Sequence, residues 1–518
     1  MTNNSSRTIN SVKNIATGFI GQFIQIFLGF INRTVFIKFL EKEYLGISGL
    51  FGNILSILSL AELGVGTAII YALYKPLSEK NEKELSILMN FYAKAYRIIG
   101  ITIAIIGLLA MPFLNIIIKD VPNIKENLYV LYCFYLFNTV ISYFYSHKNS
   151  IIIADQKNYI SSIISYLISL VQTILQILVL VITKNFLMYL MVQTICTLAF
   201  NITISNMADK LYPFLKNKIT DKLDYKEKKS LIKNIKALMI IKLSGVLVNN
   251  TDNMIITYFS GLATVGLSSN YTMLINIINT AISQIFTGVT ASVGNLNAKE
   301  SKEKQRAFFN IMNFANFWLY GFSSICIVVL INDVIRIWIG DRFILPSNIA
   351  VILAVNFYMI GMQNAIWTFK NTMGLFIHGK YILIITAIVN LILSIILGNE
   401  FELFGIFLAT ALARACTNTW YDAFVVYKYG LKIKPIEYFK RYSKFLIILI
   451  FTFLVCNYLC NFIYVDSFFM LCVKSVTCFI ICNISFLLFF KNTNEFLYFK
   501  NLLFNIVSKF TVHYIKSH

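Results

Sequence analysis

Charged residues are scarce in this chain of 518 residues. They make up 13% of the sequence, against about a quarter in an ordinary soluble domain. Proline occurs only 6 times, whereas 58% of the residues are hydrophobic and 15% are aromatic. A globule of this composition has too few polar groups to cover its surface, so a soluble protein is excluded. Long apolar helices with aromatic belts are expected instead.

Several kinds of chemistry lack the residues that they need. The sequence contains no G-x-x-x-x-G-K-[ST] motif, so we expect no P-loop ATPase in this chain. The 4 histidines show no spacing typical of metal ligands. The 9 cysteines form no C-x-x-C pair, and we interpret those near the C-terminal end as small residues of membrane helices. We therefore predict no enzyme activity, no cofactor and no metal site.

Apolar segments recur along the chain, each long enough to cross about 30 Å of hydrocarbon as a helix. We expect an all-α polytopic membrane protein with about 14 transmembrane helices. The N-terminus is polar and no cleavage site follows the first apolar stretch, which indicates that no signal peptide is removed. The expected spans are 12–37, 44–74, 92–118, 127–150, 158–183, 185–208, 232–259, 265–294, 308–331, 347–374, 380–398, 402–427, 442–464 and 467–490.

Basic residues are distributed unevenly between the two sides of the expected membrane. Along the alternating loops, 34 Lys and Arg lie on the side of the N-terminus and 7 lie on the opposite side. Because basic residues collect in cytoplasmic loops, this bias predicts that both termini are cytoplasmic. It also accounts for the net charge of +21, so no nucleic-acid partner is expected.

An internal repeat divides the expected helices into two similar sets. Shifted by 220 residues, the segment 39–46 aligns with 259–266. Six helices repeated in the same orientation predict two parallel bundles, as in many transporters. The expected parts are an N-terminal bundle (1–208), a Lys-rich cytoplasmic linker (209–231), a second bundle (232–427), two additional transmembrane helices (428–495) and an amphipathic cytoplasmic tail (496–518).

One stretch of the second expected span carries a family resemblance. Residues 45–77 read LGISGLFGNILSILSLAELGVGTAIIYALYKPL. This stretch, with the twelve-plus-two architecture, resembles the polysaccharide flippases, which share a superfamily with lipid II flippases and multidrug and toxin extruders. The resemblance implies a bacterial cytoplasmic-membrane protein that moves undecaprenyl-diphosphate-linked sugar repeat units to the outer leaflet, for capsule, O-antigen or teichoic-acid assembly.

Basic residues inside the expected spans are candidate anchors for an anionic head group. A charge at bilayer depth is costly and usually faces a cavity or a partner. Lys242 and Arg414 lie near the expected midplane, and a diphosphate needs fixed positive charge with hydrogen-bond donors. Arg33 lies nearer the outer end of the first span, where it can also reach the interface.

Acidic and amide side chains complete the candidate set. Glu62 and Asp252 are candidates for coupling transport to H⁺ or Na⁺, and an internal ion pair is the alternative for Glu62. Gln22 and Gln363 are candidates for hydrogen bonds to sugar hydroxyls. Bonds between neighbouring helices are the alternative for both amides.

Two other functions remain open on the sequence alone. An exporter of drugs or cations would need an acidic cavity, whereas most charged residues expected near the middle of the membrane are basic. A membrane polysaccharide polymerase or ligase would need a long external loop, and the external loops here are short. For the flippase, the expected partners are the lipid-linked oligosaccharide, membrane lipids, and a polysaccharide polymerase with glycosyltransferases.

Overall fold

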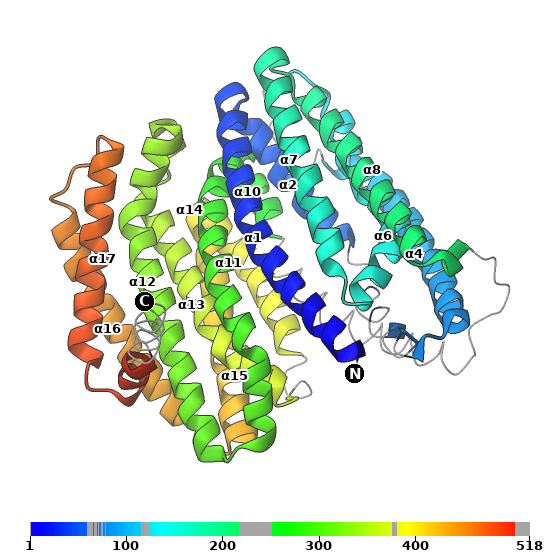
Figure 1. Cartoon of the computed structure of the whole chain (residues 1–518). Helices are drawn as coiled ribbons and strands as arrows, with labels where there is room; N and C mark the ends of the chain where they lie inside the picture. The colour runs from blue at the N-terminus through cyan, green and yellow to red at the C-terminus, as the bar shows by residue number, and fades with distance from the viewer. Residues whose placement is uncertain are drawn as a thin grey trace, which may run out of the picture. The chain divides into compact units, whose positions relative to one another are not determined.

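The described part of the chain is almost entirely helical. A computed structural model of the protein describes residues 2–59, 79–114, 124–216, 251–375 and 381–502, and a few single positions between these ranges. These residues contain no strand. Figure 1 shows the long helices that make up the chain. The expectation of an all-α polytopic membrane protein is confirmed.

The elements follow one another with short connections. In chain order they are α1 (Thr2–Phe39), α2 (Lys42–Leu58), α4 (Glu82–Ala110), η2 (Met111–Phe113), α6 (Leu128–Ala154), α7 (Asn158–Thr183), α8 (Phe186–Leu211), η3 (Pro213–Lys216), α10 (Asp252–Ser260), α11 (Leu262–Lys299), α12 (Lys302–Ile339), η4 (Asp341–Phe343), α13 (Ser347–Thr372), α14 (Ile382–Cys416), α15 (Asn418–Val425), η6 (Val426–Leu431), α16 (Ile436–Cys460) and α17 (Phe468–Phe490).

Within the described ranges, 10 segments are long and apolar enough to cross a membrane. Each expected span overlaps at least one of the helices in the structure. The second and seventh expected spans run into parts of the chain outside the described residues. Residues 494–502 are helical, and the rest of the expected amphipathic tail lies outside the described residues.

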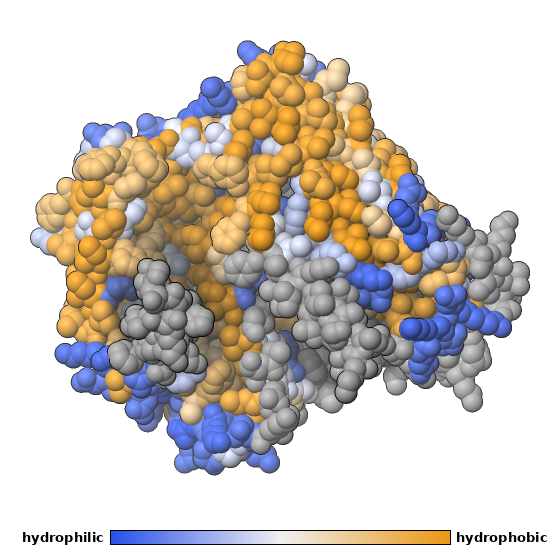
Figure 2. All heavy atoms as spheres, in the orientation of Figure 1, coloured by the Kyte–Doolittle hydropathy of each residue, from blue (hydrophilic) through white to orange (hydrophobic). Residues whose placement is uncertain are grey.

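The chain divides into two compact units, Met1–Ser269 and Asn270–His518. In the first unit, α1 packs on α7, α4 packs on α6, and α8 packs on both α6 and α7. In the second unit, α12 packs on α13, α16 and α17, while α13 packs on α14 and α15. In Figure 2, apolar residues cover the sides of the second unit's helices and hydrophilic residues gather at their lower ends, as expected for a membrane protein.

The longest apolar segment of the second unit is a helical hairpin. Within α14, Glu402 has φ 48° and ψ −129°, so the helix is broken there. Across the break the Asn390 side chain donates to Thr410 Oγ1 at 2.9 Å, which shows that the two halves run antiparallel. A Cβ at Gly405 would lie 1.9 Å from the Leu397 carbonyl oxygen, so only glycine allows this close approach. The two separate spans expected at 380–398 and 402–427 are therefore present.

Helix boundaries repeat along the chain at the expected interval. With a shift of 220 residues, the start of α2 at Lys42 falls on the start of α11 at Leu262. The start of α4 at Glu82 falls on the start of α12 at Lys302 with the same shift. The end of α8 at Leu211 falls on the end of η6 at Leu431. The same register that aligned the sequence therefore also aligns the helices.

Candidate functional site

Three of the predicted site residues lie in the described part of the first unit. Gln22 and Arg33 lie on α1, and Asp252 is the first residue of α10. An acidic side chain is favourable at this position because the helix N-terminus carries partial positive charge. Two further predicted residues, Lys242 and Glu62, lie outside the described residues. Their roles stay predictions.

Arg33 belongs to a polar patch in the first unit. Its guanidinium donates a hydrogen bond to the hydroxyl of Ser269. The neighbouring Asn32 donates to Gln176 Oε1 at 3.0 Å and to the hydroxyl of Tyr189 at 2.9 Å. These contacts join α1 to α7 and α8. Asn32 therefore forms hydrogen bonds between helices, which is the alternative role that the sequence suggested for amide side chains within spans.

In the second unit, Arg414 lies next to a break in a membrane helix. Its side chain is only 9% exposed. Three residues later Thr417 adopts φ −124° and ψ −97°, which ends α14, and the chain resumes as α15 at Asn418. The segment then passes into a π-helical turn, η6. Interrupted helices and π-turns at membrane depth are typical of sites that bind a transported substrate.

Side chains of α13 hold the residues that follow the break. Gln363, which is 2% exposed, donates to the Thr419 carbonyl at 3.3 Å. Trp367 donates from its indole nitrogen to Asp422 Oδ2 at 3.1 Å. Lys370 contacts the other oxygen of Asp422 at 2.5 Å, so this buried carboxylate is both paired and hydrogen-bonded. Three contacts one turn apart therefore fix α15 against α13.

An apolar cavity of about 670 Å³ lies beside the same break. This volume is within the range of ligand pockets, roughly 300–1,000 Å³. The walls come from α12, α13, α15, α16 and the end of α14. Lining residues include Ser324, Val351, Tyr358, Met359, Ala415, Thr419, Trp420, Tyr438, Phe439, Tyr442, Leu446 and Leu454.

Two hydroxyls of the cavity wall, those of Tyr358 and Tyr438, are buried without a hydrogen-bond partner among the described residues. Oε1 of Gln363, on the same helix as Tyr358, is likewise buried without a partner there. A buried polar group without a partner costs on the order of 1–3 kcal/mol. A bound molecule with a few oxygen atoms and a long apolar part would satisfy the hydroxyls and fill the cavity.

The structure also contains a buried ion pair that the sequence did not single out. Lys474 on α17 contacts Asp333 on α12 at 2.7 Å, and both side chains are nearly buried. Arg336 contacts the same carboxylate at 3.3 Å. Lys474 is one of the few cations inside an expected span, which was the signal available in the sequence. Its partner lies 141 residues away and could not be identified from spacing.

Gln363 contacts the segment that follows the helix break, and Arg414 lies one turn before the break. Arg33, Gln22 and Asp252 belong to the first unit, whereas Arg414 and Gln363 belong to the second.

Comparisons with known proteins show the fold. No protein-family model and no curated protein sequence matches this chain. Among solved structures, "Lipid II flippase MurJ, inward closed conformation" has a TM-score of 0.64 at 16% identity, covering 92% of this chain and 99% of that one. An inward-facing multidrug resistance MATE family transporter of the MOP superfamily has a TM-score of 0.54 at 13% identity, covering 79% and 95%. A mutant of the Vibrio cholerae MATE transporter VcmN has a TM-score of 0.55 at 14% identity, covering 83% and 99%.

These similarities establish that the chain has the fold shared by MurJ and the MATE transporters. Sequence identities this low support a shared fold and no further conclusion about function. The structural neighbours are transporters and flippases rather than enzymes.

Proposed function

We propose that this protein is a flippase that moves undecaprenyl-diphosphate-linked oligosaccharides from the inner to the outer leaflet of a bacterial cytoplasmic membrane. It would act by alternating access and supply repeat units for a surface polysaccharide. The observation that carries the proposal is the apolar cavity of about 670 Å³ beside the broken helix, with buried Arg414 one turn before the break. A lipid-linked anion has both the apolar chain and the oxygen atoms that this arrangement suits.

The chemistry of the site assigns a part of the cargo to each group. An isoprenoid segment fits the aliphatic and aromatic walls contributed by α13 and α16. The hydroxyls of Tyr358 and Tyr438 would donate to oxygen atoms near the junction of lipid and head group. Arg414 would supply fixed positive charge for the diphosphate, because its guanidinium stays protonated and donates in a fork. Lys242 is proposed as a second cation, on sequence grounds.

Export of cationic drugs is the alternative that the MATE likeness raises. Such a site needs an acidic group that is free to meet the cation. Among the described residues around the cavity, the buried carboxylate is Asp422, and Lys370 and Trp367 already bind its two oxygens. The cavity therefore favours a lipid-like cargo. Coupling to H⁺ or Na⁺ through Glu62 or Asp252 remains part of the proposal.

The decisive experiment measures transbilayer movement of a labelled undecaprenyl-diphosphate oligosaccharide in sealed proteoliposomes. An impermeant probe reports which leaflet holds the sugar. We expect protein-dependent movement with the wild-type chain and at least about tenfold slower movement with Arg414→Gln, which corresponds to about 1.4 kcal/mol. Arg342→Gln, in the exposed segment between α12 and α13, is the matched control and should leave the rate unchanged.

A second variant tests the cavity without touching a charge. Ala354→Trp fills the space between α13 and α16 with a large side chain. We expect it to slow a cargo with a long prenyl chain more than one with a short chain. If the folded protein moves none of the lipid-linked sugars tried and instead exports cationic dyes, the drug-exporter function is favoured.

A further inference from the structure

Five of the nine cysteines gather in one place, although they are scattered along the sequence. Cys326 lies on α12, Cys456 and Cys460 on α16, and Cys478 and Cys482 on α17. The Sγ atoms of Cys456 and Cys478 are 3.4 Å apart. Cys326 Sγ lies 3.6 Å from Cys478 Sγ, and Cys460 Sγ lies 3.8 Å from Cys456 Sγ. Three helices of the second unit thus share one cluster of sulfur atoms.

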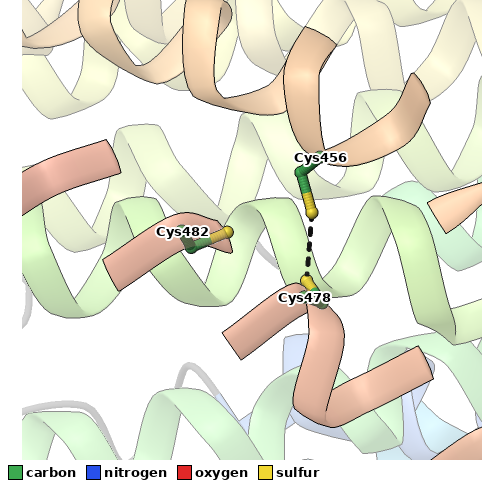
Figure 3. Close-up of side chains that lie close together, drawn as sticks. All are labelled: Cys456, Cys478 and Cys482. Carbon is green, nitrogen blue, oxygen red and sulfur yellow. Dashed lines mark hydrogen bonds between the residues drawn. The ribbon is translucent and has the colours of Figure 1, made fainter. Parts of the chain in front are cut away.

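Three of these sulfurs have the arrangement of a metal site. The Sγ atoms of Cys456, Cys478 and Cys482 all lie within 4.8 Å of one another. In Figure 3 the side chains of Cys456 and Cys478 point toward each other from α16 and α17, and Cys482 lies next to them. The three residues are 0% exposed. Cys478 and Cys482 are four residues apart and therefore lie on one face of α17.

We propose that Cys456, Cys478 and Cys482 form a buried site for Cu(I). Metal–thiolate bonds are about 2.3 Å long, so three sulfurs around one ion in a plane lie about 4 Å apart. The separations in this cluster need only small side-chain movements to reach that value. Sulfur ligands select soft ions such as Cu(I) and Zn(II), and structural zinc almost always takes four ligands. A site of three mutually close sulfurs therefore suits Cu(I) better.

A basic residue of α17 lies beside two of the proposed ligands. Lys474 lies four residues before Cys478, on the same face of α17. It contacts Asp333, whose carboxylate also contacts Arg336, and Arg336 in turn contacts the exposed Asp341. An ammonium group next to a cysteine favours the thiolate form that binds metal.

Binding at this site is ligand exchange and needs no oxidant or reductant. Each thiol that becomes a thiolate releases one proton, and copper enters and stays as Cu(I). Cys460 is the last residue of α16, beside the connection to α17, and its sulfur adjoins Cys456. It offers an intermediate ligand between the end of the helix and the site. Once bound, the ion would tie α16 to α17, the two helices beyond the repeat.

The test is retention of Cu(I) by the full-length protein, purified in detergent without oxygen and challenged with a Cu(I) chelator. We expect one tightly held Cu(I) per chain, with X-ray absorption showing sulfur ligands only. Loss of one ligand should weaken binding at least on the order of 10- to 100-fold, the loss typical of an outer-shell partner. Cys456→Ser and Cys478→Ser test this. Cys196→Ser, a buried cysteine in the first unit, and Cys416→Ser, an exposed one, are the matched controls.

A second measurement does not depend on the variants being folded. Cu(I) bound to the wild-type chain should protect Cys456, Cys478 and Cys482 from alkylation in partly denaturing conditions, as read by mass spectrometry, and should leave Cys133 and Cys416 unprotected. Equal retention by wild-type and variant chains, or no protection, would overturn the proposal. Retention of Zn(II) at these cysteines with no retention of Cu(I) would overturn the choice of ion. Neither readout involves cargo movement, so the outcome is independent of the flippase proposal.

Discussion

At the scale of single residues, two buried carboxylates of the second unit are neutralised by partners far along the chain. Asp422 is 1% exposed and is bound by Lys370 and Trp367 from another helix. Removing one member of a buried ion pair leaves an uncompensated charge, which costs more than the pair contributes. The pair therefore fixes α15 to α13 beside the helix break.

The Lys370–Asp422 pair gives a prediction about stability. Lys370→Met should destabilise the protein by about 3–5 kcal/mol, because Asp422 is left buried and unpaired. The double variant Lys370→Met with Asp422→Leu should recover most of that loss. Thermal unfolding of the detergent-purified proteins measures both effects.

An exposed ion pair provides the control for this prediction. Lys304 and Glu300 contact each other at 2.7 Å with side chains 68% and 42% exposed. Lys304→Met should change stability by no more than about 1 kcal/mol, because water screens the pair. Equal losses at the buried and the exposed site would contradict the proposed role of burial.

At the scale of elements, three glycines allow helix backbones to approach closely. Gly405 lies against the backbone of Leu397 in the α14 hairpin. In the first unit, a Cβ at Gly46 would lie 2.1 Å from the Leu262 carbonyl oxygen, where the starts of α2 and α11 cross. Gly46 and its repeat-equivalent Gly266 both lie at this crossing, because a Cβ at Gly266 would meet the Lys42 carbonyl oxygen at 2.3 Å. Small residues at helix crossings are typical of membrane proteins.

The hairpin glycine gives a prediction at this scale. Gly405→Ala should lower the thermal unfolding midpoint, at a cost of roughly 1–3 kcal/mol, because the backbone opposite cannot move aside as a side chain would. Gly52→Ala is the matched control in α2, where an added Cβ meets nothing within 4 Å. It should leave stability unchanged or raise it by about 0.5–1 kcal/mol, because alanine is the better helix former. A stable Gly405→Ala protein would show that the hairpin does not need this close approach.

At the scale of the whole molecule, the surface is that of a protein immersed in lipid. Large apolar side chains such as Ile182 (78% exposed), Phe469 (73%) and Ile447 (68%) project from the long helices. Such exposure in water would favour aggregation, whereas a bilayer accommodates it. Basic residues at the helix ends then decide the orientation.

The orientation gives a prediction for the whole molecule. A cysteine introduced at Asp466, between α16 and α17, should react with an impermeant thiol reagent on intact cells. A cysteine introduced at Glu300, between α11 and α12, should react only after the membrane is permeabilised. The wild-type chain, whose own cysteines lie in membrane helices, gives the background for both. The opposite pattern would place the termini outside the cell.

Sequence alone determined the fold class, and it predicted the spans and the repeat. Hydropathy and helix length are local properties, so each expected span overlaps a helix in the structure, and the shift of 220 residues aligns helix boundaries as well as side chains. Arg414 and Gln363 were also identified from the sequence, because polar residues in apolar runs are conspicuous. Whether they bind cargo stays a proposal.

Only the tertiary structure decided which distant residues meet. Lys474 contacts Asp333, and Lys370 contacts Asp422. The cysteines of three helices also come together, although 22 to 152 residues separate the sulfur partners on different helices. The cavity beside Thr417 likewise forms from several helices and a local break. Packing between helices depends on how apolar faces fit one another, and no pattern in one segment contains that information.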